Sequence, residues 1–333
     1  MFTSDELLKL VNDNLDNMPY ERKPKSLYEP VRYVLKIGGK RIRPVLMLLA
    51  YNLYKDAPEN ILSSAIALEI YHNYTLLHDD LMDNAPMRRG KPTVHKRWDA
   101  NTAILSGDSM LVLAFEKMAQ CCPDKLKPVI DLFTETALEI GEGQQYDMEF
   151  ETRSNVTEDE YIEMIRLKTS VLLACALKIG AILADAPDED AENLYRFGEQ
   201  IGLAFQLQDD YLDVYGDPKV FGKATGGDIL SNKKTYMLIN ALAKADDNQR
   251  KELEQWLAVE GEETTGMERT DAQNAKIRAV TDIYNKVGID RMAQEKINYF
   301  FEESKKYLAA VKVPEEKKMM LREYTAKMMR RNK

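Results

Sequence analysis

Two stretches of the chain share one pattern of carboxylates, and they decide how the rest is interpreted. Residues 76–83 read LLHDDLMD and residues 205–213 read FQLQDDYLD, so an Asp-Asp-x-x-Asp motif occurs twice. In a helix of about 3.6 residues per turn, the first and last carboxylates of such a motif lie on one face. Apolar residues surround both motifs, and turn-forming residues follow the first motif directly and the second after two residues. Both stretches are therefore predicted to be mostly buried helices that end just after the carboxylates.

These carboxylates are unfavourably placed unless a cation neutralises them. A lone acidic motif is usually a solvated helix face, but these two recur among apolar residues, where unpaired charge is costly. Carboxylates near a helix C-terminus also oppose the helix dipole by about 0.3–1 kcal/mol each. Hard oxygen ligands favour magnesium over zinc, and protein-bound magnesium commonly bridges to phosphate oxygens. The motifs therefore predict a magnesium–phosphate site with six candidate metal ligands: Asp79, Asp80, Asp83, Asp209, Asp210 and Asp213.

The rest of the chain also predicts helices. A capping-box sequence begins at Thr157 and precedes apolar residues at helical spacing, and Thr3 or Ser4 can cap a first helix. Turn residues cluster between the predicted helices, and no run of β-branched residues alternates convincingly with polar ones. The charged segment 244–271 is predicted to form two polar helix ends and a surface loop. We therefore expect one all-α domain over residues 1–333.

Composition argues against several classes of protein. The net charge of -9 in 333 residues argues against general nucleic-acid binding, which needs a basic surface. No Gly-x-x-x-x-Gly-Lys-Ser/Thr loop is present, which argues against an ATPase. The first residues lack a signal-peptide pattern, and the most apolar stretch, residues 171–184, is too short to span a membrane. The three cysteines, Cys121, Cys122 and Cys175, form no disulfide framework and predict buried thiols in a reducing cytoplasm.

Positive charge is concentrated close to the acidic motifs. Residues 38–44 read GGKRIRP, residues 88–92 read RRGKP directly after the first motif, and residues 222–228 read GKATGGD after the second. Lys168 lies on a predicted mid-chain helix. Arg and Lys are natural diphosphate ligands, Arg through its bidentate fork and Lys as a point charge. We also expect His72, which lies close to the helix face of the first motif, to contact phosphate.

Taken in order, these motifs closely resemble those of the trans-type isoprenyl diphosphate synthases. The resemblance runs from Gly38 to about Tyr236. It implies an all-α bundle of long helices around a deep apolar cavity, usually as a homodimer. It also implies an enzyme that condenses isopentenyl diphosphate with an allylic diphosphate (dimethylallyl, geranyl or farnesyl) and releases diphosphate. The chain departs from the family pattern at Asn232, where many members have Gly before the last basic motif.

The resemblance further implies roles for individual residues. Asp79 and Asp83 would bind two magnesium ions and Asp209 a third, with Asp80, Asp210 and Asp213 in support. The allylic diphosphate would also be held by Arg88, Lys168, Lys223 and Lys233. The isopentenyl diphosphate site would comprise Lys40, Arg43, His72 and Arg89. Thr169 and Gln206 would stabilise the allylic carbocation and help to position substrate. The candidate catalytic residues are accordingly Asp79, Asp83, Arg88, Lys168, Thr169, Gln206, Asp209 and Lys223.

The residues just before the first motif bear on product length. Tyr74 lies five residues before Asp79, about 7.5 Å along a helix axis at ~1.5 Å per residue, and the small Thr75 follows it. A tyrosine here is usually core packing, but in the family this position resembles the floor that limits chain growth. One bulky residue, with no insertion in the motif, resembles the pattern of geranylgeranyl producers. A farnesyl or a longer product remains the alternative.

Two other functions fit part of the pattern. A class I terpene cyclase or a head-to-head synthase would share the first acidic motif and the helical fold. Such enzymes usually carry an Asn/Ser/Glu metal motif second and do not need the GGKRIR stretch. A non-catalytic partner subunit commonly loses acidic motifs, whereas both are intact here. Activity of the purified chain alone separates these alternatives.

Overall fold

The chain divides into two compact units in a computed structural model that describes residues 2–19, 22–217, 225–259 and 270–330. The first unit comprises Met1–Glu135, Cys175–Tyr195 and Ala310–Arg322. The second comprises Thr136–Ala174, Arg196–Ala309 and Glu323–Lys333. Each boundary between them falls inside a helix rather than in a linker. The prediction of one domain over the whole chain stays a prediction.

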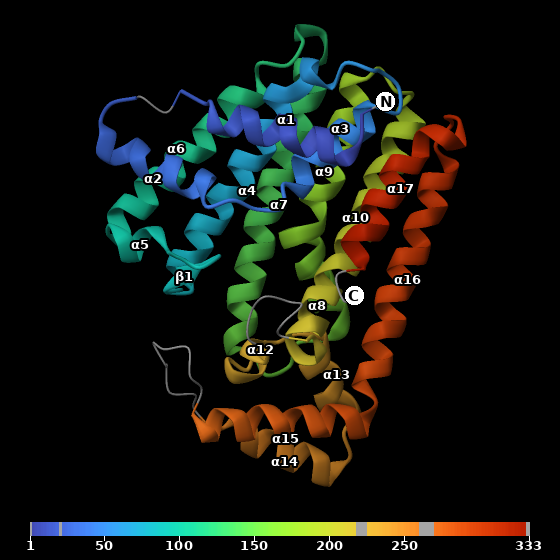
Figure 1. Cartoon of the computed structure of the whole chain (residues 1–333). Coiled ribbons are helices and arrows are strands. Elements are labelled where there is room, and N and C mark those ends of the chain that lie inside the picture. Colours follow the sequence, from blue (N-terminus) through green and yellow to red (C-terminus); the bar gives the residue numbers. More distant parts are fainter. Residues whose placement is uncertain (1, 20–21, 218–224, 260–269, 331–333) are drawn as a thin grey trace. The chain divides into compact units, whose positions relative to one another are not determined.

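The first unit is a set of helices packed around α4 (Figure 1). In it α4 (Leu62–Met82) packs against α6 (Ala100–Met118), α3 (Ile42–Tyr51) and α2 (Lys25–Lys36). Both α3 and the first half of α4 are buried on almost every side, as expected for helices that are apolar all round. The other elements up to the unit boundary are α1 (Ser4–Asp16), η1 (Pro58–Ile61), β1 (Met87–Arg88), β2 (Lys91–Pro92), α5 (Val94–Arg97), η2 (Pro123–Lys125) and the start of α7 (Leu126–Thr152).

Short-range hydrogen bonds explain where helices begin. The Thr3 hydroxyl accepts the Glu6 amide, and the Glu6 carboxylate accepts the Thr3 amide in return, so the predicted cap of α1 is confirmed. The same reciprocal pair joins Thr157 and Glu160 at the start of α8 (Glu158–Ile165). A side-chain cap of this kind stabilises a helix by about 1 kcal/mol.

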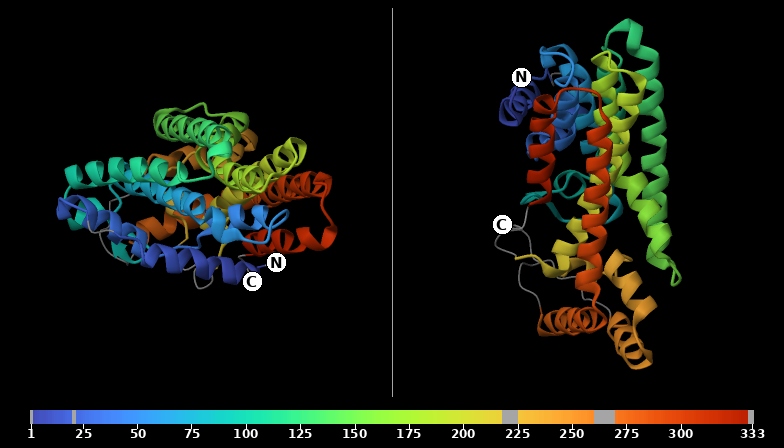
Figure 2. Two further views of the ribbon diagram at one scale, coloured as in Figure 1. Left: turned by 90° about the horizontal axis from the view of Figure 1, so that it is seen from above. Right: turned by 90° about the vertical axis from the view of Figure 1, so that its right-hand side faces the viewer.

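The second unit is built largely from later elements. After α8 the chain forms the π-helical turn η3 (Arg166–Ser170), α9 (Val171–Leu183), α10 (Asp188–Tyr215), α12 (Gly227–Leu230), α13 (Tyr236–Lys244), α14 (Asp247–Leu257), α15 (Asp271–Val287), α16 (Ile289–Ala310) and α17 (Glu315–Met329). Of these, α9, α10, α16 and α17 contribute residues to both units. Within the second unit α15 packs against α12, α13 and α14 (Figure 2). Its core includes Tyr161, Met237, Ile283 and Ile289.

The predicted all-α class is confirmed, with one local correction. Among the described residues the only sheet is the two-stranded pair of β1 and β2. The predicted helix ends and surface loop at 244–271 are wrong in part, because α14 is a helix of its own, capped by Asp246. Only Leu253 of α14 is buried. One buried side chain makes too thin an apolar stripe to mark a helix in the sequence.

Two further expectations concern the surface. No described helix is both long and apolar enough to cross a membrane. Cys175 is buried as predicted, but Cys122 is exposed and Cys121 partly so. The prediction of buried thiols is therefore wrong for Cys122, which precedes η2 outside the core.

Candidate active site

The first acidic motif lies at the C-terminal end of α4, as predicted. Asp83 ends the helix and donates its amide to the carbonyl of Asp79 at 2.9 Å, so these two residues lie on consecutive turns of one face. Asp80 points elsewhere and is buried. Its two oxygens accept hydrogen bonds from the Arg88 guanidinium at 2.8 Å. Burial raises the pKa of Asp80, and the Arg88 charge opposes that rise. Asp80 therefore holds Arg88, whose Nη2 also lies 3.8 Å from Asp79.

A tight hairpin places the two arginines that follow the motif. Arg88 pairs with Lys91 across β1 and β2, which leaves Arg89 and Gly90 as a two-residue turn. Both turn residues have positive φ, 50° and 73°, as a type I′ turn requires. The Arg89 guanidinium then donates to the Gly38 carbonyl. A Cβ on Gly39 would lie 2.7 Å from Arg89 Nη1, so any larger residue there would require the guanidinium to move, and the φ of 152° also favours glycine.

Four arginines surround His72 in the same unit. Burial is the main cause that lowers the pKa of His72 well below 6.5, and the charges of Arg43, Arg89, Arg88 and Arg41 lower it further. Burial also lowers the pKa of Arg43 to about 10; the charge of Glu69 opposes this shift and the repulsion of Arg89 adds to it. The Nε of Arg43 is buried without a hydrogen-bond partner among the described residues. A buried donor without a partner is unfavourable, and so is the repulsion between the neighbouring arginines. An anion such as a phosphate group would accept the hydrogen bond and neutralise the positive charge.

Lys168 and Thr169 lie in the π-helical turn η3 of the second unit. Such turns are rare in proteins, and those that do occur are often found at functional sites. Thr169 Oγ1 donates to Gln206 Oε1 at 3.0 Å, and Gln206 Nε2 donates to Asp210 Oδ1 at 2.9 Å. The Tyr161 hydroxyl donates to the other oxygen of Asp210. One hydrogen-bonded chain thus connects η3 with the second acidic motif.

Buried carboxylates of this unit are tied to nearby cations and amides. Lys168 Nζ lies 2.6 Å from Asp147 on α7. Burial raises the pKa of Asp147, but Lys233 and Lys168 together outweigh it, and the pKa is lowered overall. Burial raises the pKa of Asp210 to about 6 against the opposing effect of Lys233. Asp213 accepts the Asp228 amide at 2.9 Å in the first turn of α12.

The remaining predicted residues are placed as follows. Lys40 and Lys233 are exposed on loops, and Asp209 is partly buried on α10. Asn232 has φ 54°, the left-handed region that glycine favours and asparagine tolerates. The departure at Asn232 therefore keeps a backbone that glycine would also adopt. Tyr74 and Thr75 are partly buried on α4. Lys223 lies outside the described residues.

Comparison with known proteins identifies the family. The profile of polyprenyl synthetases matches residues 24–273. The chain belongs to the polyprenyl synthetase family. It is 43% identical over 236 residues to a geranylgeranyl diphosphate synthase of Methanosarcina mazei, covering 70% of this chain and 73% of that protein. It is 42% identical over 254 residues to a short chain isoprenyl diphosphate synthase of Methanocaldococcus jannaschii, covering 76% and 77%. A solved geranylgeranyl pyrophosphate synthase superposes with a TM-score of 0.93 at 40% identity over 100% of both chains. The family resemblance inferred from the motifs is thus confirmed.

The acidic motifs of this polyprenyl synthetase fit magnesium that is shared with substrate. No three His, Cys, Asp or Glu side chains form a ready-made metal site in the described part of the chain. Magnesium, however, is often bound by one or two carboxylates and completed by water and substrate phosphates. Asp79 and Asp83, on consecutive turns at a helix end, supply such a pair. Asp80, Asp210 and Asp213 accept hydrogen bonds from Arg88, Gln206 and the Asp228 amide, which suits the supporting role expected of them.

Three positions in this polyprenyl synthetase escaped the sequence analysis. Asp147 pairs with Lys168, Tyr161 bonds to Asp210, and a Cβ on Gly143 would lie 2.4 Å from the Lys168 amide nitrogen. The first two carry no local signal, because lone Asp and Tyr residues are common on helices. Gly143 did carry one, since an interior helix glycine often marks close approach of another backbone.

Proposed function

We propose that this polyprenyl synthetase condenses isopentenyl diphosphate with an allylic diphosphate and releases diphosphate. The product is a short-chain all-trans prenyl diphosphate, and geranylgeranyl diphosphate is the proposed main product. The observation that carries this proposal is the cluster of arginines around His72, with the unsatisfied Nε of Arg43, in the same unit as the Asp79–Asp83 face. The proposal is supported by a relative that is 43% identical to this chain and is named geranylgeranyl diphosphate synthase.

Each substrate has its own set of residues in this proposal. Asp79, Asp83 and Asp209 would hold three magnesium ions, which when bound would neutralise charge that develops on the leaving diphosphate. Lys168, Lys223, Lys233 and Arg88 would bind the allylic diphosphate. Lys40, Arg43, Arg89 and His72 would bind isopentenyl diphosphate, with the neutral His72 imidazole able to donate one hydrogen bond.

The chemistry asks little more of the side chains. The allylic C–O bond breaks, the double bond of isopentenyl diphosphate attacks the resulting cation, and one proton is then lost. The hydrogen bonds that join Thr169, Gln206 and Asp210 fix the positions of the Thr169 hydroxyl oxygen and the Gln206 carbonyl oxygen. These two neutral oxygens can face a cation without reacting with it. No described side chain is an obvious base, so the released diphosphate would take the proton.

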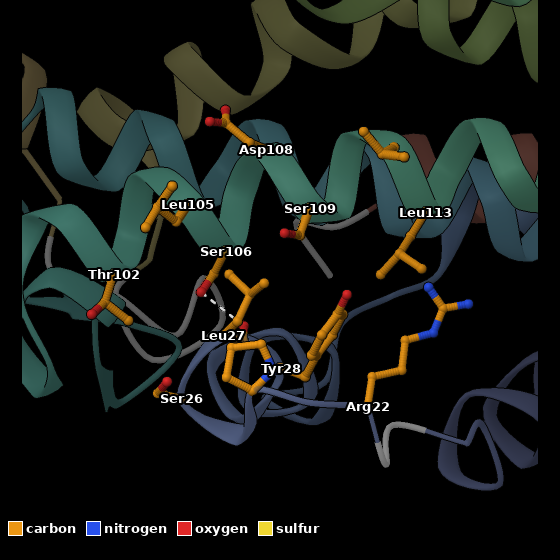
Figure 3. A pocket seen from close by; sticks show the side chains of 12 residues that line it. Arg22, Ser26, Leu27, Tyr28, Thr102, Leu105, Ser106, Asp108, Ser109 and Leu113 are labelled. Atoms are coloured by element: carbon orange, nitrogen blue, oxygen red, sulfur yellow. Dashed lines mark hydrogen bonds between the residues drawn. The ribbon is translucent and has the colours of Figure 1, made fainter.

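A homodimer is part of the same proposal. On α6, Leu105 and Val112 expose 57% and 67% of their surface, and they are seven positions apart, so they lie on one helix face. Beside them lies a groove of about 470 Å³, which Leu27 and Tyr28 of α2 also line (Figure 3). A second copy of the chain bound at this groove would cover these side chains. The three free cysteines support a cytoplasmic location.

The proposal is tested by sizing products. Purified protein is incubated with magnesium, isopentenyl diphosphate and, in separate reactions, dimethylallyl, geranyl or farnesyl diphosphate, and the dephosphorylated products are separated by length. We expect geranylgeraniol as the main product. Farnesol or longer alcohols would keep the reaction and change the product assignment. Folded protein that elongates no primer would favour a cyclase or a partner subunit instead.

A further inference from the structure

A row of aromatic side chains in the first unit ends at the first acidic motif. Phe133 of α7 meets Tyr71 edge-on with ring centroids 5.3 Å apart, and Tyr71 lies 5.4 Å from Tyr74. Tyr74 in turn meets His78 edge-on at 4.9 Å. Phe133 and Tyr71 are buried in the core. The Tyr74 ring is thus supported by a fixed ring on one side and by His78 on the other.

His78 is itself fixed against α6. Its Nε2 lies 3.2 Å from the carbonyl oxygen of Ile104, and since a carbonyl can only accept, Nε2 carries the proton. Directly beside it is Gly107, where a Cβ would lie 2.1 Å from Nε2 and 2.5 Å from Cδ2. Any residue larger than glycine would occupy the place of the imidazole. Helices α4 and α6 lie side by side (Figure 1), and the absence of a side chain at Gly107 leaves the space between them that the His78 ring fills.

We infer that His78 is a positioning residue: seated against Gly107, it fixes the orientation of the Tyr74 ring and so helps to set the length of the prenyl product. A tyrosine on a helix has alternative staggered side-chain rotamers, and a neighbouring ring restricts which of them it can adopt. With His78 in place, Tyr74 is confined from both sides. Without it, only Tyr71 restrains the ring. The inference rests on the proposed function and on the assignment of Tyr74 as the floor for chain growth.

A double-mutant cycle tests whether His78 acts through Tyr74. The proteins are wild type, His78→Ala, Tyr74→Ala and the double variant, and the measurement is the distribution of product lengths at equal conversion. We expect His78→Ala to raise the fraction of products longer than the wild-type main product several-fold. In the Tyr74→Ala background the same change should have no further effect, because the ring that His78 positions is gone. A mere loss of stability would lower the yield without moving this distribution.

A substitution at Gly107, against which the His78 ring packs, provides a second test in which the imidazole itself is retained. Gly107→Ala should displace His78 and so shift the product distribution of the protein that has Tyr74. The same substitution should not shift the distribution of the Tyr74→Ala variant. Gly141→Ala adds the same methyl group on α7, where no heavy atom lies within 4 Å, and should leave the distribution unchanged. Unaltered products from His78→Ala, or an equal shift with and without Tyr74, would overturn the inference. Wild-type protein that elongates no primer would instead refute the proposed function, so the two failures are distinguishable.

Discussion

Two glycines of α7 make a matched pair for testing the π-helical turn that carries Lys168. A Cβ on Gly143 would lie 2.4 Å from the Lys168 amide nitrogen and 2.8 Å from the Leu167 carbonyl carbon. These are backbone atoms, so no side-chain rotation can relieve the clash. A Cβ on Gly141 meets nothing within 4 Å. Replacing each glycine by alanine therefore adds the same methyl group with opposite consequences for the turn.

The expected effect follows from these distances. Ordinary contact begins at 3.4 Å, so relieving a contact of 2.4 Å requires the turn and α7 to separate by about 1 Å. A misplacement of about 1 Å can lower turnover by roughly 100-fold, because binding groups no longer meet the substrate in a reactive geometry. Overpacking costs about 1–3 kcal/mol, and the better helix propensity of alanine offsets about 1 kcal/mol of that. Gly141→Ala gains the higher helix propensity of alanine without a steric clash.

We expect Gly143→Ala to lower kcat by roughly 10- to 100-fold and the free energy of unfolding by up to about 2 kcal/mol. We expect Gly141→Ala to keep kcat and to raise the free energy of unfolding by about 1 kcal/mol. The assay is magnesium-dependent condensation at saturating substrate, with urea unfolding of each variant in parallel. Equal kcat for the two variants would refute the reasoning, because it would show that the turn need not stay where α7 holds it.

Three further predictions address the metal ligands, the product and pH. Asp79→Ala or Asp83→Ala should abolish magnesium-dependent turnover while the circular dichroism spectrum stays that of the wild type; near-normal turnover would contradict the metal assignment. Tyr74→Ala should lengthen the products in the sizing assay, and an unchanged product would place the floor elsewhere. Burial and the surrounding arginines lower the pKa of His72, so the fold favours the neutral imidazole, and this contribution to stability is present above pH 6.5 and lost as the pH falls below it. Relative to His72→Gln, the wild type should lose up to about 1.4 kcal/mol per pH unit below that point in urea unfolding, and parallel losses would contradict the shifted pKa.

The sequence was sufficient for the fold class and for the ends of the two helices that carry the acidic motifs. Spacing alone placed Asp79 and Asp83 on one face of a helix that ends directly after them, and the structure has this arrangement. The reason is that helix periodicity, caps and turn residues are local properties. The sequence could not tell which member of the motif turns inward. Asp80 does so and accepts hydrogen bonds from Arg88 of β1, and that pairing depends on the fold of a segment eight residues away.

The π-helical turn is a second feature beyond local signals. Arg166 to Ser170 are ordinary helix-compatible residues, and nothing in them predicts one extra residue per turn. Its neighbours come from elsewhere in the unit: a Cβ on Gly143 would meet the Lys168 backbone, and one on Gly202 would meet Ser170 at 2.5 Å. A residue's role that depends on such neighbours becomes visible only in three dimensions.

Arg41 shows how a motif can contain both structural and functional charges. In the sequence it is one of three cations in the GGKRIRP stretch, and no sequence feature distinguishes its role from that of Lys40 or Arg43. In the structure Arg41 is buried, donates to Glu69 at 2.6 Å and to the Leu35 carbonyl at 2.7 Å, and so has its charge neutralised. Removing one partner of such a buried pair costs about 3–5 kcal/mol because the other charge is left unpaired. Arg41 therefore holds the stretch in place, and the charge available to an anion in this stretch comes from its neighbours, of which Arg43 has the unsatisfied Nε.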